Sequence, residues 1–189
     1  MRRTATAAVA VALLAAGCGG SGEPAAVGQV PPPDTTAPTA PTSTTLSRAE
    51  IEQAVLDAYL ANWDAYTAAS DPADPEFPGL AETRTGRALE RAQEQLAAYQ
   101  FTGRVGRYPN GSIAEHRAEV VSVGSDEATV RDCNIDDGQL VIAATGEVVN
   151  DLVATVLFEG SMVVEDGRWK LRSLKVIEKW DGVAGCAVD

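Results

Sequence analysis

The stretch "VVEDGRWKL", residues 163–171, decides the fold. It places Asp166-Gly167 between two alternating runs of polar and apolar residues. An Asp-Gly pair in that setting is typical of a tight β-hairpin turn. We therefore expect an antiparallel pair of strands at 148–164 and 168–179.

Strand signals also fill the region before this hairpin. From Ser112 onward the sequence is rich in Val, Thr and Ile and is interrupted by turn motifs. These patterns predict further strands at 112–123, 127–134 and 139–143. The glycine-spaced stretch "GRVGRYPNG", which precedes the strands, is expected to be a connector. The acidic pairs at turns are expected to be solvated loop tips; these are Asp136-Asp137 and Glu165-Asp166.

Two helices are predicted ahead of the strands. The first begins at "LSRAEIEQ", where Ser47 and Glu50 have the spacing of a capping box and Leu46 and Ile51 that of a hydrophobic staple. Apolar side chains then recur at three- and four-residue steps along one stripe, formed by Ile51, Val55, Tyr59, Trp63 and Tyr66. The prolines of "DPADPEFPGLAET" end this helix. A second helix is predicted from Gly86 to Gln100, with one face formed by Leu89, Ala92, Leu96 and Tyr99.

Helices followed by an antiparallel meander predict an α+β fold. In such a fold the helices cover one face of a curved sheet. Residues 46–189 are about as long as one ordinary domain, so we expect a single folded unit there.

The N-terminal residues have the pattern of an export signal. Arg2 and Arg3 precede an uncharged run from Thr4 to Ala16, which is typical of a secretory signal peptide over residues 1–17. The run is shorter than the roughly 20 apolar residues that span a bilayer, so a permanent transmembrane helix is not expected.

Cys18 follows directly, in "LLAAGCGG". The stretch resembles a bacterial lipobox, although Ala15 stands where that pattern has leucine, three residues before the cysteine. The resemblance implies that Cys18 carries diacylglycerol and anchors the chain to the outer face of the cell membrane. Two acyl chains give stable attachment. The alternative is an ordinary signal peptide in which Cys18 has no role.

The segment behind Cys18 has the composition of a tether. Residues 19–45 are rich in Gly, Pro, Thr and Ala, with no aromatic side chain and almost no charge. Such a segment cannot bury enough apolar surface to offset its ordering entropy. We expect a lipidated, disordered tether at 18–45 in front of the folded domain at 46–189.

The three cysteines of the chain leave Cys133 and Cys186 once Cys18 is lipidated. An exported compartment permits these two to form a disulfide. The bridge would close a loop of about 53 residues and stabilise the fold by about 4 kcal/mol. The alternatives are two buried free thiols or a metal pair. The single histidine makes the metal-site pattern poor, and neither a metal nor a cofactor is expected.

The formal net charge is −12, from 27 acidic and 15 basic residues. Strong acidity argues against binding to nucleic acid and against flat docking on anionic lipid. The chain also lacks the G-x-S-x-G, G-x-x-x-x-G-K and H-E-x-x-H motifs, so the common hydrolase, nucleotide and zinc-protease signatures are excluded.

The long aromatic helix, the "RAEVVSVGSDEATVRDC" hairpin, the "ATGEVV" turn and the final "VVEDGRWKL" hairpin resemble a known superfamily. They are similar to secreted nuclear transport factor 2-like domains of high-GC bacteria, over roughly residues 46–189. The resemblance implies a cone-shaped, cystatin-like fold with a strongly bent antiparallel sheet packed against N-terminal helices. It also implies a pocket between them. SnoaL-like polyketide cyclases and steroid isomerases use that pocket as an active site, whereas many relatives only bind or dimerise.

Enzymes of this superfamily place an aspartate, often with a histidine or tyrosine, inside the cone. His116 alternates with Ala118 and Val120 and is a candidate base if that face points inward, although one bulge would reverse it. Asp132 alternates with Ala128 and Val130 and is a second candidate. The structural alternatives are a half-exposed or structurally paired histidine, and an aspartate bonded to backbone amides or solvated near a strand end.

The aromatic stripe allows two interpretations. Tyr59, Trp63 and Tyr66 could line a ligand pocket, or could simply form the core. The function we prefer is that of a non-catalytic binding domain, anchored to the membrane outside the cytoplasm. It would bind a protein partner or a small apolar ligand at the cell envelope, or form a homodimer. A SnoaL-like isomerase or cyclase with an Asp or His base is the first alternative. A carrier of hydrophobic ligands is the second.

Overall fold

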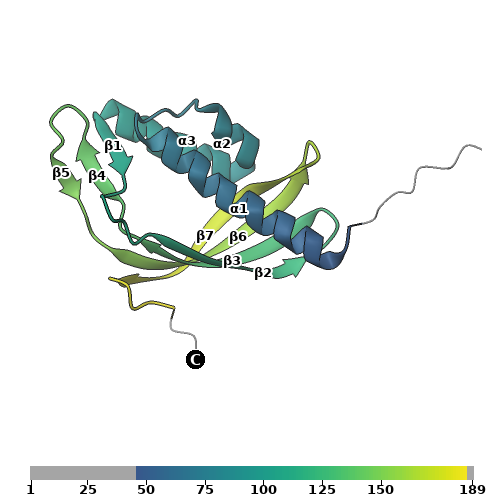
Figure 1. The fold of residues 1–189 in the computed structure, drawn as a ribbon. Helices are drawn as coiled ribbons and strands as arrows, with labels where there is room; N and C mark the ends of the chain where they lie inside the picture. The colour runs from purple at the N-terminus through teal and green to yellow at the C-terminus, as the bar shows by residue number, and fades with distance from the viewer. Residues whose placement is uncertain (1–45, 187–189) are drawn as a thin grey trace, which may run out of the picture. The chain divides into compact units, whose positions relative to one another are not determined.

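A computed structural model describes residues 46–186; the predicted signal peptide, Cys18 and the tether lie outside the described residues. Three helices come first: α1 (Arg48–Ser70), α2 (Pro78–Thr83) and α3 (Gly86–Phe101). Strands follow in the order β1 (Arg104–Arg107), β2 (Glu115–Val123), β3 (Glu127–Asp136), β4 (Gln139–Ile142), β5 (Val148–Asn150), β6 (Ala154–Glu165) and β7 (Arg168–Asp181). The predicted α+β class is confirmed, because the helices lie over one face of a strongly bent antiparallel sheet (Figure 1).

The start of α1 follows from its sequence. The Ser47 hydroxyl accepts a hydrogen bond from the Glu50 amide at 3.3 Å, and the Glu50 carboxylate accepts one from the Ser47 amide at 2.7 Å. The predicted capping box is therefore confirmed. It satisfies two backbone donors that a helix start otherwise leaves without partners.

The strands form two sheets that share a bend. One has the order β2-β3-β6-β7 and the other β1-β4-β5. β3 passes into β4, and β5 into β6, through short breaks where an acid or amide side chain bonds the backbone. The Asp136 carboxylate accepts from the Gly138 amide, and the Asn150 side-chain oxygen accepts from the Leu152 amide, each at 2.9 Å. These Asx turns redirect both strands at the same level and so bend the sheet.

Three sequence predictions need correction. The single strand expected at 148–164 is divided into β5 and β6 by the Asn150 turn. The expected connector "GRVGRYPNG" contains β1, which pairs antiparallel with β4 and extends the smaller sheet. The proline-rich segment after α1 includes the short helix α2, because Pro78 occupies the first helical position, where its missing N–H is not needed.

The β6–β7 hairpin is closed as predicted. Asp166 and Gly167 have φ values of 54° and 74°, and Glu165 pairs with Arg168. Positive φ at both central residues matches the right-handed twist of the flanking strands. The turn therefore sets the register of the longest strand pair.

The core lies between α1 and the concave face of the larger sheet. Tyr59 and Val55 are fully buried there with Val130, Met162 and Leu171. Gly160 on β6 allows this contact: a Cβ at that position would lie 3.0 Å from Tyr59 Cε2 and 3.1 Å from Leu171 Cδ1. Glycine at this strand position thus lets the helix approach the sheet closely.

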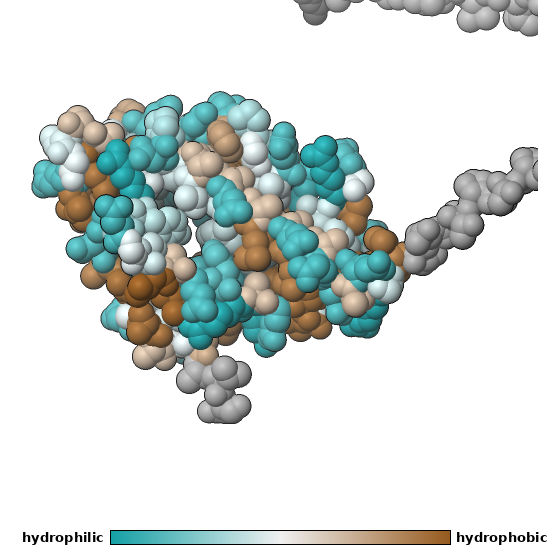
Figure 2. Space-filling model, in the orientation of Figure 1, coloured by the Kyte–Doolittle hydropathy of each residue, from teal (hydrophilic) through white to brown (hydrophobic). Residues whose placement is uncertain are grey.

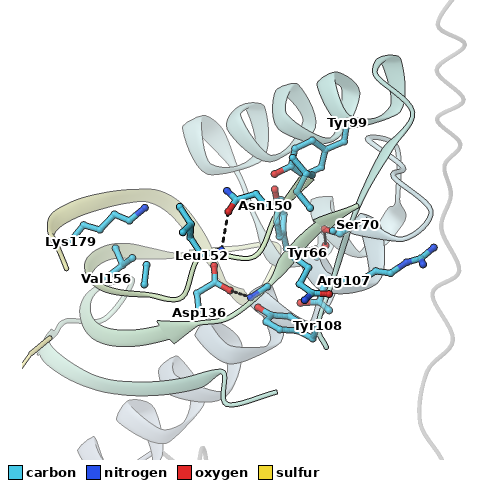
Figure 3. A pocket seen from close by; sticks show the side chains of 16 residues that line it. Tyr66, Ser70, Tyr99, Arg107, Tyr108, Asp136, Asn150, Leu152, Val156 and Lys179 are labelled. Atoms are coloured by element: carbon cyan, nitrogen blue, oxygen red, sulfur yellow. Dashed lines mark hydrogen bonds between the residues drawn. The ribbon is translucent and has the colours of Figure 1, made fainter. Parts of the chain in front are cut away.

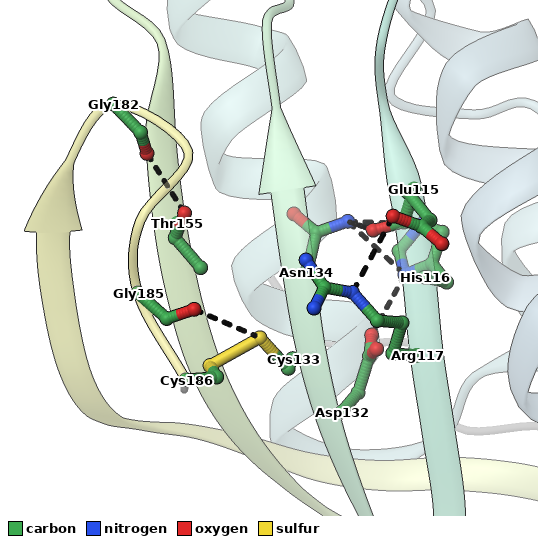
Figure 4. The surroundings of a disulfide bond; sticks show 10 residues. All are labelled: Glu115, His116, Arg117, Asp132, Cys133, Asn134, Thr155, Gly182, Gly185 and Cys186. Carbon is green, nitrogen blue, oxygen red and sulfur yellow. Dashed lines mark hydrogen bonds and ion pairs between the residues drawn. A yellow bond between two sulfur atoms is a disulfide. The ribbon is translucent and has the colours of Figure 1, made fainter. Parts of the chain in front are cut away.

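The segment after β7 folds back over the convex face of the sheet (Figure 4). The Thr155 hydroxyl donates to the Gly182 carbonyl at 2.7 Å, and Cys186 forms a disulfide with Cys133 of β3. The Cα atoms of the two cysteines lie 6.1 Å apart. This C-terminal strap covers Thr155, which is fully buried, so the convex face is closed near the start of β6.

In the part of the chain that the structure describes, no helix combines the length and the apolar character that crossing a membrane requires.

We predict that reducing the disulfide lowers the free energy of unfolding by about 4 kcal/mol, because the unfolded chain gains the entropy of a 53-residue loop. Urea denaturation of the oxidised and reduced protein measures the difference. Cys133→Ser with Cys186→Ser should match the reduced protein. Equal midpoints for the oxidised and reduced forms would contradict the prediction.

Candidate functional site

The register of the sheet brings the two sequence candidates together. His116 of β2 pairs with Asn134 of β3, and Ala118 pairs with Asp132, so His116 and Asp132 are diagonal neighbours on the concave face. The bulge in this pair lies between Val120 and Ser122, beyond His116. The side chains of both residues therefore lie on the inner face of the sheet, the direction that their alternation allowed.

Asp132 is fully buried and is held by two side chains. Its Oδ2 atom accepts a hydrogen bond from the Tyr59 hydroxyl at 3.1 Å and lies 2.7 Å from His116 Nδ1. The pKa of Tyr59 is raised far above its ordinary value. Burial is the largest cause, and the charge of Asp132 is the second. Tyr59 thus keeps its proton and acts as a donor to the carboxylate.

His116 is fixed on more than one side (Figure 4). The Asn134 amide nitrogen lies 3.1 Å and 3.2 Å from its two ring nitrogens, and the Trp63 ring lies 5.0 Å from the imidazole between centroids. Among the described residues its hydrogen-bond partners are Asp132 and Asn134. The imidazole and carboxylate have the arrangement of a base and its orienting acid. No described hydroxyl or thiol is bonded to the imidazole as a nucleophile.

A cavity lies elsewhere, at the bend of the sheet. It has a volume of about 290 Å³ and opens between the two helices α1 and α3 and the β4–β5 end of the fold (Figure 3). Tyr66, Tyr99 and Tyr108 line it from the helical side and from the segment after β1. The opposite wall comes from the strands and contains Asp136, Leu140, Asn150, Leu152, Ala154, Val156 and Lys179.

The three tyrosines keep their protons at neutral pH. The pKa of Tyr66 is raised to about 12. Burial is the largest cause, and the nearby Tyr99 is the second. Burial also raises the pKa of Tyr108 to about 12, with the nearby Asp136 as the second cause, and raises the pKa of Tyr99. Each hydroxyl can therefore donate and accept a hydrogen bond. The cavity offers neutral hydroxyl groups opposite a wall that combines apolar, polar and charged side chains, which suits recognition of a small molecule.

The aromatic stripe of α1 divides between two roles. Tyr66 lines the cavity, whereas Tyr59 lies in the core and bonds Asp132. Trp63 is packed between the rings of His116 and Phe158, at 5.0 Å and 5.4 Å between centroids. None of these assignments can be read from the stripe alone, because all three residues repeat at the same helical spacing.

Sequence reasoning missed most of the cavity. Tyr99 was placed on the apolar face of the second helix, and Tyr108 lay in the presumed connector. Asp136 and Asp137 were expected to be solvated loop tips, and this is wrong for Asp137: it is buried, and it accepts hydrogen bonds from the Ser112 hydroxyl and the Ile113 amide. The one sequence signal for a structural role of Asp137 is the Asp-Gly turn motif that it forms with Gly138 directly after a strand.

No group of three or more His, Cys, Asp or Glu side chains among residues 46–186 is arranged to hold a metal ion. His116 and Asp132, which contact each other, have an asparagine and a tyrosine as their further partners.

Comparisons with known proteins give distant structural likenesses only. No family model matches the chain, and no curated protein matches it. The intermembrane space region of the chloroplast protein ARC6 is similar at 18% identity and a TM-score of 0.47, over 65% of this chain and 95% of that one. The Kfla4162 protein of Kribbella flavida is similar at 13% identity and a TM-score of 0.43, over 70% and 95%.

A putative scytalone dehydratase of Novosphingobium aromaticivorans is similar at 18% identity and a TM-score of 0.40. The match covers 70% of this chain and 99% of that one. Likenesses at this level say nothing about ligand or reaction, so the function has to be argued from the geometry.

We predict that Tyr59→Phe lowers the free energy of unfolding by about 1–3 kcal/mol, because the buried Asp132 carboxylate loses a donor. Tyr108→Phe is the matched control: Tyr108 is 42% exposed, and we expect a change below about 0.5 kcal/mol. Chemical denaturation followed by tryptophan fluorescence measures both. A Tyr59→Phe protein as stable as the parent would show that the hydrogen bond contributes nothing.

Proposed function

We propose that this chain is a membrane-anchored extracytoplasmic lipoprotein whose folded domain binds a small molecule without catalysing a reaction. The observation that carries the binding role is the cavity of about 290 Å³ with three protonated tyrosines on one side. It lies between the helices and the bent sheet. In nuclear transport factor 2-like domains, which the sequence resembles, this is the place of the pocket.

The lining defines the class of ligand. One side presents tyrosine hydroxyls, and the other presents the side chains of Leu140, Leu152 and Val156. A ligand with an apolar body and one or more hydrogen-bonding groups would complement both. Asp136 and Lys179 add a charge of each sign to the strand wall, which makes a purely hydrophobic carrier function less suited to this cavity.

An isomerase or cyclase is the second candidate, and one observation favours it. His116 Nδ1 lies 2.7 Å from Asp132 Oδ2, which would orient the imidazole as a general base. Against it, Trp63 stacks on the ring and Asn134 contacts both ring nitrogens. The lining of the tyrosine cavity includes neither His116 nor Asp132. A substrate in that cavity would not meet the base, so we favour binding.

A protein partner or a second copy of the chain is the remaining binding role. Apolar side chains group on the surface below β4 and β5 (Figure 2). Leu152, Val148 and Val149 are exposed in this part of the chain, Leu152 by 77%. Leu152 also lines the tyrosine cavity, so a partner bound here would sit over its opening.

The proposed location rests on the sequence, with one structural support. The lipobox-like segment at Cys18 predicts export and anchoring. The Cys133–Cys186 disulfide is compatible with an oxidising compartment outside the cytosol.

We predict that 2-naphthol, an apolar body with one hydroxyl, binds in the tyrosine cavity. Tyr66→Phe should weaken it about threefold to tenfold, because one hydrogen bond is lost while the ring packing stays. Equilibrium titration followed by tyrosine and tryptophan fluorescence measures the affinity.

Tyr59→Phe is the matched control for this experiment, since it removes a hydroxyl that lies outside the cavity and should leave the affinity unchanged. Asp132→Asn separates the enzyme candidate: the carboxylate that orients the His116 base would be needed for turnover but not for binding. Equal loss of affinity in Tyr66→Phe and Tyr59→Phe, or no binding by the parent protein, would count against the proposed site.

We also predict that the native protein carries diacylglycerol on Cys18 and fractionates with membranes. Mass spectrometry of the N-terminal peptide measures the modification. Cys18→Ser should shift the protein to the soluble exported fraction, whereas Cys133→Ser should not. An unmodified Cys18 in the membrane-free fraction of wild-type cells would rule out the anchor.

A further inference from the structure

A second cavity, of about 420 Å³, lies between α3 and the β6–β7 pair. Its helical side carries three arginines, Arg84, Arg87 and Arg91, and its strand side carries Phe158, Leu174 and Val176. No residue lines both this cavity and the tyrosine cavity. We call it the arginine cavity.

Arg84 is a buried cation without an acidic partner. Its side chain is only 6% exposed, and among the described residues no carboxylate forms an ion pair with it. Its Nη2 atom makes one long hydrogen bond, of 3.4 Å, to the Asn62 carbonyl, and its Nε atom has no partner. The guanidinium carbon lies 4.9 Å from the centre of the Tyr66 ring and 6.0 Å from that of Trp63.

This placement is unfavourable for an isolated protein. A buried charge is normally paired or neutralised, since desolvation costs several kcal/mol per ion. Burial lowers the pKa of Arg84 to about 10, which still leaves the side chain protonated at neutral pH. Stacking on two aromatic rings offsets only part of such a cost. The unpaired Nε therefore points to a partner that the protein itself does not supply.

Arg87 and Arg91 increase the positive charge at the same place. They lie one turn apart on α3, where two like charges repel each other. No ion pair joins either of them to an acid within the described residues, although the chain has 27 acids and 15 basic side chains. Three arginines without an ion pair around one cavity thus concentrate positive charge at one place in an acidic protein.

The strand side of the cavity is mostly apolar, with one hydroxyl from Ser173. Phe158 and Leu174 are half-buried, and Val176 is 55% exposed. A free inorganic anion would use the arginines and leave this wall in water. An anion with an apolar chain would use both walls.

We propose that the arginine cavity binds a single-chain amphiphilic anion, with its carboxylate or phosphate on Arg84, Arg87 and Arg91 and its apolar chain against Phe158, Leu174 and Val176. Guanidinium groups match the planar or tetrahedral oxygens of such head groups through paired hydrogen bonds. Binding would give the buried Arg84 the counter-charge that it lacks.

Decanoate, below its micelle concentration, is the probe, with 1-decanol as the uncharged chain and inorganic phosphate as the head group alone. Calorimetric titration of the full chain measures all three. We expect decanoate to bind at least tenfold more tightly than either control. Added salt should weaken the binding of decanoate, because salt screens the attraction between its carboxylate and the arginines.

The double variant Arg87→Gln with Arg91→Gln should weaken decanoate binding at least tenfold. Arg48 is an exposed arginine of α1 outside the cavity, so Arg48→Gln should leave the affinity unchanged. Arg84→Met should abolish binding and leave the melting temperature of the unliganded protein equal or higher, since an unpaired buried charge is removed. If Arg84→Met does not fold, the double variant alone decides.

Three results would overturn this proposal: decanol binding as tightly as decanoate, phosphate alone binding as tightly, or decanoate affinity unaffected by the double variant. The 2-naphthol titration keeps the two cavities separate in the test. Arg87 and Arg91 do not line the tyrosine cavity, so the double variant should leave 2-naphthol affinity unchanged, and failure of one cavity would not be mistaken for failure of the other.

The source of the anion is distinguished by a second arm. Vesicles of phosphatidylglycerol present the phosphate in a bilayer, and the proposal expects them not to retain the protein through Arg87 and Arg91. Vesicle retention that disappears in the double variant would assign the arginines to a membrane surface and overturn the single-chain ligand.

Discussion

The contact of Tyr59 with Gly160 is the constraint on which the rest of the structure depends. A glycine at the middle of β6 lets the ring of an α1 residue lie directly on the sheet. The Tyr59 hydroxyl is then fixed over β3, within hydrogen-bond distance of Asp132. One close approach thus sets the height of α1 above the concave face and determines which side chains of its stripe meet the strands.

This contact fixes the rotation of α1 about its axis, which determines which of its side chains enter the core and which line the tyrosine cavity. Tyr59 faces the centre of the sheet, and Trp63 fills the space against His116 and Phe158. Tyr66, two turns beyond Tyr59, reaches the bend, where β3 and β6 leave for the smaller sheet. The Asx turns at Asp136 and Asn150 hold that bend open. The middle of the helix therefore covers a polar cluster, and its C-terminal part lines the tyrosine cavity.

The polar groups beneath the helices differ in how fully they are satisfied. His116 is bonded to both Asp132 and Asn134, although one oxygen of Asp132 has no partner. Arg84 is paired with aromatic rings and one distant carbonyl. A buried group with partners is explained by stability, whereas a buried cation without an acid is more simply explained by a ligand. This contrast is why we assign structure to the first group and binding to the second.

The sequence by itself determined the α+β class, the capping box at Ser47 and the β6–β7 hairpin, and its alternation made His116 and Asp132 candidates for the inner face. Each of these depends on neighbours in the chain: a cap, a turn dipeptide or a two-residue alternation. It also singled out Cys133 and Cys186 as a pair. Only the tertiary structure decided that Tyr66, Tyr99 and Tyr108 share a cavity and that Arg84 joins Arg87 and Arg91. Those groupings depend on the rotation of each helix over a bent sheet, and that rotation is set by packing between segments far apart in the chain.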